Sequence, residues 1–273
     1  MLPCEAGELS AKPTEGAFGL PASSELEDAI LPQTTSTPVA IVAGGGSGIG
    51  QACALQLGRT GWRVVVVGRD AAKLASTVGQ ITQAGGVAEA FPGDVRDWDR
   101  MAALAEVVAA DGLDLLINSA GGQFSAPTAE LSANGWRAVV DTNLTGAFYL
   151  ARQLYPALCK RRGAVVNVVA NLWQRGAPGL AHSAAARAGV VNLTKSLAVE
   201  WAGDGVRVNA VSPGVTDTAG LRRYEKHAEA LAKVPLGRAA TAEEVAEAIL
   251  FMGRSAYITG DVLTIDGGLQ LVG

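Results

Sequence analysis

Short apolar runs alternate with longer segments of helical pattern from Pro38 onward. The apolar runs are rich in Val, Ile and Leu and lack alternating polar residues, which is typical of strands buried on both faces. They predict strands at Val39–Ala43, Trp62–Val67, Val87–Phe91, Leu113–Ile117, Ala164–Ala170, Val206–Val211 and Val262–Ile265. Helices are expected from the glycine turn at 44–50 to Thr60, and at Asp70–Ala84, Trp98–Ala110, Gly135–Arg161, His182–Ala202 and Thr241–Met252. This order predicts the α/β class, with a doubly wound (Rossmann-type) parallel sheet, helices on both faces and a single domain.

The segment before the first expected strand has a different composition. Residues 1–38 contain five of the 11 prolines, eight Ser or Thr, six acidic residues and one basic residue. Such a segment buries too little apolar surface to offset the entropy that it would lose on ordering. We therefore expect a disordered, acidic, proline-rich tail at residues 1–37 and the dinucleotide-binding and catalytic domain at 38–273.

Composition excludes several classes of function. The 273 residues are 49% hydrophobic and carry a net charge of −4, so nothing in the charge favours nucleic acid or an anionic membrane as a partner. No run of about 18 apolar residues occurs, so no transmembrane helix is expected. The three cysteines lack C-x-x-C spacing and there are two histidines, which predicts free thiols and no metal site. These features favour a cytoplasmic protein that acts on a small molecule.

A glycine-rich turn follows the first expected strand and opens the first helix. Its glycines allow the backbone to approach a pyrophosphate, and the N–H groups at the helix start attract an anion. In this strand–turn–helix context, the G-x-x-x-G-x-G spacing predicts a dinucleotide site. The candidate residues are Gly44, Gly46, Ser47, Gly48, Ile49 and Gly50.

The end of the second expected strand indicates which dinucleotide binds. A carboxylate there would bind the ribose hydroxyls of NAD, but the strand ends in Gly68 and Arg69. Because a guanidinium can bind a 2′-phosphate through charge-assisted hydrogen bonds, NADP(H) is the expected cofactor. The alternative is that Arg69 is only solvated and Asp70 binds the ribose. After the third strand, Asp94 either accepts a hydrogen bond from the adenine amine or caps a turn.

From about residue 38 to 273, the chain resembles the short-chain dehydrogenase/reductase family. The motifs that carry the resemblance are Ala43-Gly44 with Gly48-Ile49-Gly50, Asp94-Val95, Asn118-Ser119-Ala120-Gly121, Asp141-Thr142-Asn143-Leu144, Arg207-Val208-Asn209-Ala210-Val211-Ser212-Pro213-Gly214 and Asp266-Gly267-Gly268. The resemblance implies a homotetramer of Rossmann-type domains. It also implies cofactor contacts by Asp94, Val95, Asn118, Ala120 and Gly121, and a nicotinamide carboxamide held by Pro213, Gly214, Val215 and Thr216.

The chain departs from the family at the catalytic positions. The family has a Ser followed by Tyr-x-x-x-Lys, and the matching positions here are Ala170, Ser183 and Arg187. Asn143 alone of the usual tetrad is kept. Carbonyl reduction needs an acid beside the developing alkoxide, but Ser183 is a weak acid and an arginine does not release its proton. On a helix, Ser183 and Arg187 still share one face, so they can donate hydrogen bonds and bind the cofactor ribose.

Reduction of a C=C bond conjugated to a thioester does not require a strong acid in the site, in contrast to carbonyl reduction. The charge moves to the thioester oxygen as an enolate, which needs hydrogen bonds rather than an immediate proton. Asn143, Ser183 and Arg187 are therefore the candidate catalytic residues for an NADPH-dependent 2-enoyl or dienoyl thioester reductase. Gly121-Gly122-Gln123-Phe124 and the segment from His182 to Val190 also resemble the peroxisomal trans-2-enoyl-CoA reductases and, more distantly, the 2,4-dienoyl-CoA reductases. A ketone or 3-oxoacyl reductase and a non-catalytic NADP-binding homologue are the alternatives.

Overall fold

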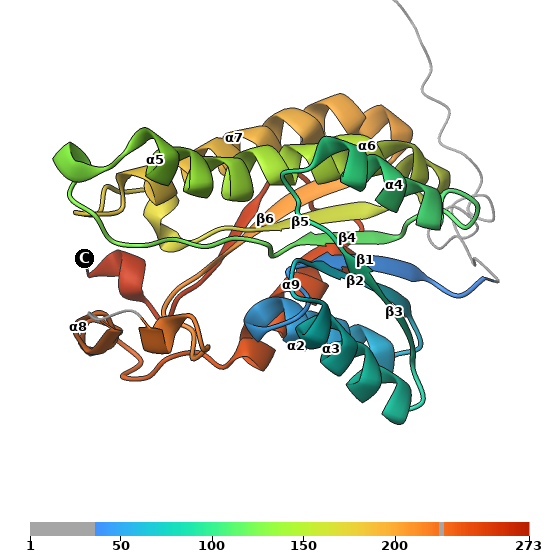
Figure 1. Ribbon diagram of the computed structural model, residues 1–273, viewed down its shortest axis with the longest axis horizontal. Helices are drawn as coiled ribbons and strands as arrows, with labels where there is room; N and C mark the ends of the chain where they lie inside the picture. Colours follow the sequence, from blue (N-terminus) through green and yellow to red (C-terminus); the bar gives the residue numbers. More distant parts are fainter. Residues whose placement is uncertain (1–35, 224–226, 273) are drawn as a thin grey trace, which may run out of the picture. The chain divides into compact units, whose positions relative to one another are not determined.

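A computed structural model describes residues 36–223 and 227–272, so the expected tail lies almost wholly outside the described residues. Seven strands form one parallel sheet in the order β3-β2-β1-β4-β5-β6-β7 (Figure 1). The strands are β1 (Val39–Ala43), β2 (Arg63–Gly68), β3 (Val87–Pro92), β4 (Leu115–Asn118), β5 (Ala164–Val168), β6 (Arg207–Pro213) and β7 (Val262–Ile265). The predicted doubly wound parallel sheet is confirmed. Its strand order reverses between β1 and β4, where such sheets bind their ligands.

Helices cover both faces of the sheet (Figure 1). On one face lie α2 (Gly48–Arg59), α3 (Ala71–Gln83) and α9 (Ala242–Arg254), and on the other lie α4 (Trp98–Val108), α6 (Gly146–Arg161) and α7 (Ala181–Trp201). The shorter α5 (Ala133–Val140) and α8 (His227–Ala232) complete the described helices, and α8 was not expected from the sequence.

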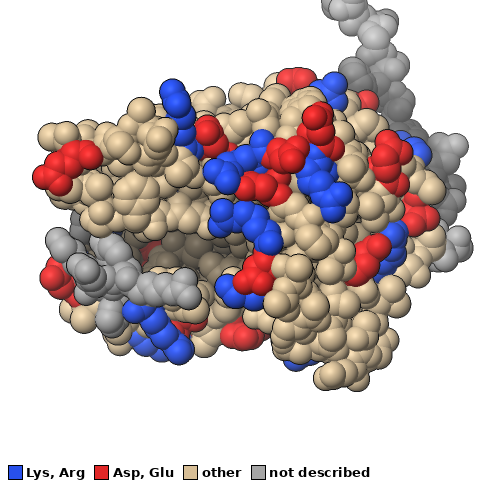
Figure 2. Space-filling model, viewed as in Figure 1, with Lys and Arg blue, Asp and Glu red and all other residues tan. Residues whose placement is uncertain are grey.

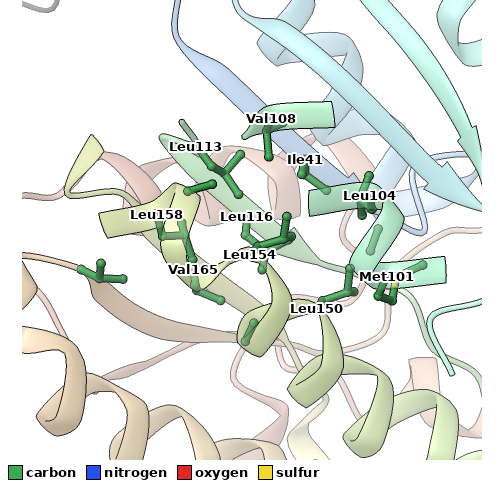
Figure 3. Close-up of a cluster of buried hydrophobic side chains, with 14 of the residues drawn as sticks. Ile41, Met101, Leu104, Val108, Leu113, Leu116, Leu150, Leu154, Leu158 and Val165 are labelled. Atoms are coloured by element: carbon green, nitrogen blue, oxygen red, sulfur yellow. The ribbon is translucent and has the colours of Figure 1, made fainter. Parts of the chain in front are cut away.

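The core is divided by the sheet into two apolar layers. Within β1, Ile41 belongs to the cluster under α4 and α6, whereas Val42 belongs to the cluster under α2 and α9. Figure 3 shows the first cluster, in which Leu104 of α4 and Leu154 of α6 meet Ile41. A strand that is apolar at successive positions is thus buried on both faces, as expected. The exceptions are the two edge strands: Val87 of β3 is 59% exposed, and all four residues of β7 are only half-buried.

The long helix expected at Gly135–Arg161 is interrupted. Between α5 and α6, residues Asp141–Thr145 form a single π-helical turn. A π-helical turn inserts one extra residue into the helix and is frequent at functional sites. Here the turn carries Asn143, whose side chain is buried.

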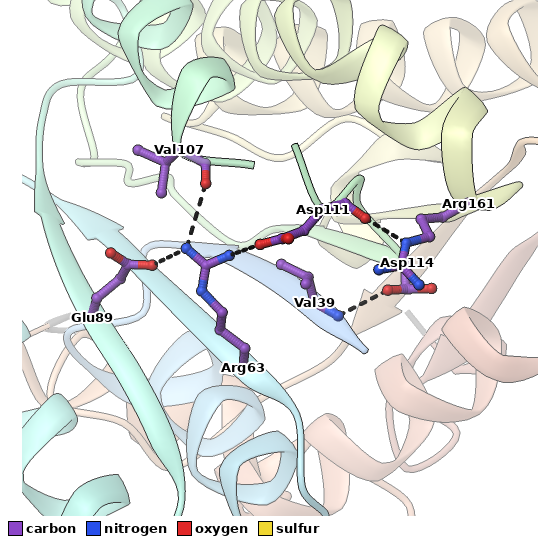
Figure 4. Close-up of polar contacts among 7 residues, drawn as sticks. All are labelled: Val39, Arg63, Glu89, Val107, Asp111, Asp114 and Arg161. Atoms are coloured by element: carbon purple, nitrogen blue, oxygen red, sulfur yellow. Dashed lines mark hydrogen bonds and ion pairs between the residues drawn. The ribbon is translucent and has the colours of Figure 1, made fainter. Parts of the chain in front are cut away.

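At the amino ends of the strands, the charged side chains have partners (Figure 4). Arg63, the first residue of β2, forms ion pairs with Glu89 at 2.6 Å and with Asp111 at 2.8 Å. The Asp114 carboxylate accepts a hydrogen bond from the backbone N–H of Val39 at 2.8 Å, and Arg161 donates to the carbonyl of Asp111. These contacts connect β1, β2, β3 and the end of α6 at the edge opposite to the expected site.

Candidate active site

The glycine turn lies directly against the loop that follows β4. Gly44 has φ +78°, and a Cβ on it would lie 2.7 Å from the carbonyl oxygen of Ser119. A Cβ on Gly50, in the first turn of α2, would lie 2.4 Å from the carbonyl oxygen of Gly44. Both positions therefore require glycine for backbone conformation or for close packing. The turn places the start of α2 at the carboxyl edge between β1 and β4.

The start of α2 keeps its backbone N–H groups available. Ser47, which precedes the helix, makes no side-chain capping hydrogen bond, and the first turn holds no acidic residue. A Cβ on Gly48 would lie 3.3 Å from Cγ2 of Thr218, so the segment after β6 borders the same turn. Free N–H groups beside a glycine cradle fit a pyrophosphate, which is the anion of a dinucleotide.

On the adenosine side, Arg69 and Asp70 are in different situations. Arg69 is exposed and makes no hydrogen bond or ion pair within the described part of the chain. Asp70 caps α3 by accepting from the N–H of Lys73 at 3.2 Å, a bond that lowers the pKa of its carboxyl. If Asp70 bound a ribose, it would have to give up the hydrogen bond that caps α3. The Arg69 guanidinium, in contrast, is available to bind a phosphate.

Asp94 has the capping role that was one of its two predicted alternatives. Its carboxylate accepts from the backbone N–H of Arg96 at 3.0 Å and from the Arg96 guanidinium at 2.6 Å. These bonds hold the pKa of the Asp94 carboxyl below its usual value. The neighbouring Val95 is buried and packs against Gly146 at the start of α6, so this segment positions the π-helical turn.

The side chain of Asn118 is buried and uses its amide nitrogen within the protein. Its Nδ2 donates to Oδ1 of Asn167 at 2.7 Å, and Asn167 donates to Thr194 of α7 at 2.9 Å. This buried chain of bonds ties the ends of β4 and β5 to α7. We did not expect Asn167 and Thr194 from the sequence, although Asn167 is a polar residue within an otherwise apolar strand. Oδ1 of Asn118 is buried and has no partner among the described residues.

Gly121 brings two of the candidate catalytic residues together. A Cβ on Gly121 would lie 2.5 Å from Oδ1 of Asn143 and 2.8 Å from an Nη of Arg187. Asn143 donates to the carbonyl oxygens of Gly122 at 2.8 Å and Val139 at 2.7 Å. The π-helical turn therefore aims the Asn143 amide at the loop after β4, where it fixes the backbone at 121–122.

Ser183 is fully buried and is hydrogen-bonded to Gln123, a residue that the sequence did not single out as catalytic. Its hydroxyl donates to Oε1 of Gln123 at 2.7 Å, and Ser183 itself is 0% exposed. Gln123 lies in the loop after β4 and is exposed. A ligand in the site would therefore meet the Gln123 carboxamide first, with Ser183 holding it in place. His182, also buried, packs edge-on against Phe124 with ring centroids 4.7 Å apart.

Arg187 is a partly buried cation of α7 whose guanidinium reaches the end of β5. It donates from Nη1 to the carbonyl oxygen of Val168 at 2.6 Å, and its Nε has no partner among the described residues. No ion pair involving Arg187 occurs in the described part of the chain. Burial without a counter-charge lowers the pKa of its guanidinium to about 10, so it is charged at neutral pH.

The remaining predicted positions form the segment after β6. The N–H of Gly214 donates to the carbonyl of Ile265 at 2.9 Å, and the hydroxyl of Thr216 donates to the carbonyl of Gly214 at 3.3 Å. Val215 accepts from the N–H of Ala240 at 2.9 Å. Pro213 ends β6, so the segment starts at the same edge of the sheet as the glycine turn. On this side of the molecule Figure 2 shows a hollow, between α5 and the segments that follow β6.

Comparison with known proteins gives the family. A family model described as enoyl-(acyl carrier protein) reductase matches residues 43–270. The protein named "probable 2,4-dienoyl-CoA reductase" of Bacillus subtilis is 40% identical over 245 residues, which cover 85% of this chain and 96% of the relative. The chain belongs to the short-chain dehydrogenase/reductase family. Both the fold and the family expected from the sequence are thus confirmed.

Solved structures of short-chain dehydrogenases/reductases agree with this assignment. A short chain dehydrogenase from Bacillus anthracis superposes with a TM-score of 0.80 and 37% identity, covering 85% of this chain and 96% of that one. A variant of actinorhodin polyketide ketoreductase with NADPH gives a TM-score of 0.82 at 34% identity, covering 86% and 97%. Among the described residues there is no group of three metal-ligating side chains and no helix long and apolar enough to cross a membrane.

Proposed function

We propose that this short-chain dehydrogenase/reductase uses NADPH to reduce the C=C bond of a 2-enoyl or dienoyl thioester such as trans-2-enoyl-CoA. The observation that carries the proposal is the set of groups around Gly121. Its members Asn143 and Arg187, together with Ser183 and Gln123, offer hydrogen-bond donors and a cation, and none of these four side chains is suited to deliver a proton at neutral pH. The similarity to a 2,4-dienoyl-CoA reductase supports the same reaction class.

The fit of the cofactor rests on the glycine cradle and the uncapped start of α2. When bound, NADPH supplies a hydride to the β-carbon of the substrate. Arg69 would hold the 2′-phosphate, and Arg187 would bind the hydroxyls of the nicotinamide ribose. The similar ketoreductase structure that contains NADPH supports the choice of cofactor.

The residues of this chain then stabilise the negative charge that develops on the thioester oxygen. Nε2 of Gln123 makes no hydrogen bond to the described residues, because Ser183 engages the other end of the carboxamide. Gln123 would donate to the thioester oxygen, Ser183 would position Gln123, and the Arg187 charge would stabilise the enolate. Asn143 would hold the backbone of the loop that carries Gln123. Water would protonate the α-carbon after the hydride has arrived.

A 3-oxoacyl or ketone reductase is the second candidate, because the family includes the ketoreductase described above. It would require an unusual acid, since Ala170, Ser183 and Arg187 stand at the positions that the family uses for proton transfer. A homotetramer and a cytoplasmic location stay predictions, and the proposed thioester substrate would give the protein a role in fatty acid metabolism.

The deciding experiment follows NADPH oxidation with crotonyl-CoA, longer 2-enoyl-CoAs, a 2,4-dienoyl-CoA and acetoacetyl-CoA side by side. We expect turnover of one or more of the unsaturated thioesters and little or none of acetoacetyl-CoA. Faster reduction of acetoacetyl-CoA would contradict the proposal and favour a ketoreductase. Tight NADPH binding without turnover of any substrate would favour the non-catalytic homologue.

A further inference from the structure

Arg187 is a partly buried cation of the site that has no ion pair among the described residues, unlike the exposed Arg69, which water can solvate. The Arg187 guanidinium is anchored to the carbonyl of Val168. Taking a cation out of water without a counter-ion is costly, so such a group is retained where its charge has a use. A neutral donor could make the same hydrogen bond to Val168.

The fold places this charge on one particular half of a bound dinucleotide. The pyrophosphate lies at the glycine turn after β1, and Arg69 at the end of β2 marks the adenosine side. The other half must then extend over β4 and β5, on the opposite side of the switch point. Arg187 lies there, at the end of β5 and beside Gly121 after β4. The nicotinamide half therefore meets the unpaired cation.

We propose that Arg187 makes the protein select the reduced dinucleotide over the oxidised one. The nicotinamide ring is uncharged when reduced and carries one positive charge when oxidised. A partly buried cation without an ion pair among the described residues repels the positively charged oxidised ring and has no such repulsion with the uncharged reduced ring. The protein would thus bind NADPH tightly, release NADP⁺ readily and favour reduction over oxidation. The inference rests on the proposed function only for the identity of the cofactor.

A carboxylate near the nicotinamide ring would weaken this selection. The buried carboxylate to consider is that of Asp266. Asp266 lies beside Gly214 in the segment expected to hold the carboxamide. Its two carboxylate oxygens accept from the backbone N–H groups of Gly268 at 2.9 Å and Gln270 at 2.8 Å. These bonds fix the Asp266 carboxylate in the turn before the C-terminus but do not neutralise it, so the selection requires the Arg187 charge to act on the ring more strongly than the Asp266 charge does.

The test compares the dissociation constants of NADPH and NADP⁺ by calorimetric titration without any acyl substrate. We expect native protein to bind NADPH at least about tenfold more tightly than NADP⁺. Arg187→Gln keeps a donor but removes the charge, and should bring the two constants within about threefold of each other. Arg187→Lys keeps the charge and should preserve most of the preference. Loss of a ribose contact weakens both nucleotides alike, so the ratio isolates the effect of charge. Thermal unfolding of each variant shows whether it is folded.

Equal affinity for the two redox states in native protein, or an unchanged ratio in Arg187→Gln, would overturn the inference. Because binding is measured without substrate, the outcome is independent of which thioester is reduced. A native protein that reduces 2-enoyl-CoA yet binds both redox states equally would overturn this inference and leave the proposed function in place. Failure to bind either nucleotide would overturn both.

Discussion

At the amino ends of the strands, Arg63 is paired with both Glu89 and Asp111, whereas at the carboxyl ends Arg187 has a backbone carbonyl and no carboxylate. Helix starts at the carboxyl edge differ in the same way. Thr241 and Glu244 close the start of α9 with a reciprocal capping box, but Ser47 leaves the start of α2 uncapped. In each contrast, one member has its charge or its N–H groups satisfied by side chains of this protein. The other member, Arg187 or the start of α2, has no such side-chain partner among the described residues.

The difference indicates which polar groups are candidates for contacts with a ligand. A buried polar group without a partner costs about 1–3 kcal/mol, so a chain selected for stability alone would satisfy it. Among the described residues, the buried atoms without a partner include Nε of Arg187, Oδ1 of Asn118 and both ring nitrogens of His182. At the carboxyl edge, the polar groups without a hydrogen-bond partner are therefore the ones to test for ligand contacts. Groups that have partners within the chain serve as controls.

The largest effect is expected at Gln123. Gln123→Glu keeps an acceptor for the Ser183 hydroxyl but replaces the free donor with a negative charge. Turnover of a 2-enoyl-CoA should fall by about 10²–10³, the usual cost of one lost oxyanion donor, while NADPH affinity stays the same. Ser183→Ala should lower turnover by less, with little change in NADPH affinity, because it loosens Gln123 without removing it.

A matched control for the added charge is Gln83→Glu at the exposed end of α3. It introduces the same chemical change far from the site and should leave steady-state kinetics unchanged. Turnover of Gln123→Glu within threefold of native would refute a direct role for Gln123. A larger loss in Ser183→Ala than in Gln123→Glu would assign the donor to Ser183 instead.

The next effect compares two glycines of similar backbone conformation. Gly44 has φ +78° and Gly61 has φ +80°, but a Cβ at Gly44 would meet Ser119 whereas nothing lies within 4 Å at Gly61. Gly61→Ala should cost only the strain of about 1 kcal/mol and leave cofactor binding intact. Gly44→Ala should cost more and weaken NADPH by tenfold or more, because the cradle must move. Denaturant unfolding measures the loss of stability in both variants, and titration with NADPH measures the loss of affinity. Equal losses of NADPH affinity would show that backbone strain, rather than the contact with Ser119, determines the effect.

A smaller effect is expected at the adenosine side. Arg69→Ala should weaken NADPH by about 1–3 kcal/mol through loss of charge-assisted bonds to the 2′-phosphate, with little effect on NADH. Arg59→Ala, at the exposed end of α2, is the control for a lost surface cation. Titration with both cofactors measures the effect. If native protein binds NADPH and NADH equally, Arg69 does not select the cofactor.

Sequence periodicity was sufficient for the sheet, because buried parallel strands such as β1 are apolar at every position. It could not reveal the π-helical turn at 141–145, since the apolar spacing continues through it. Nor could it show that Ser183 faces Gln123, because that bond joins residues 60 positions apart in the chain. The glycine turn and Arg69 could be proposed from the sequence because each is a local signal, whereas the partners of Asn118 and Arg187 depend on how β5 and α7 pack.

The smallest effect concerns the satisfied helix start at α9. The Glu244 carboxyl pairs with Arg238 at 2.6 Å and accepts from the N–H of Thr241 at 2.8 Å, which lowers its pKa from 4.5 to about 2. A carboxyl with a depressed pKa contributes stability above its unfolded pKa and loses it as the pH falls through the folded value. The free energy of unfolding of native protein should therefore exceed that of Glu244→Gln at pH 6, and the difference should shrink between about pH 4.5 and 2. Urea unfolding across this range measures it. Because the pair is exposed the difference should be small, and a difference independent of pH would show that the cap, rather than the charge, stabilises α9.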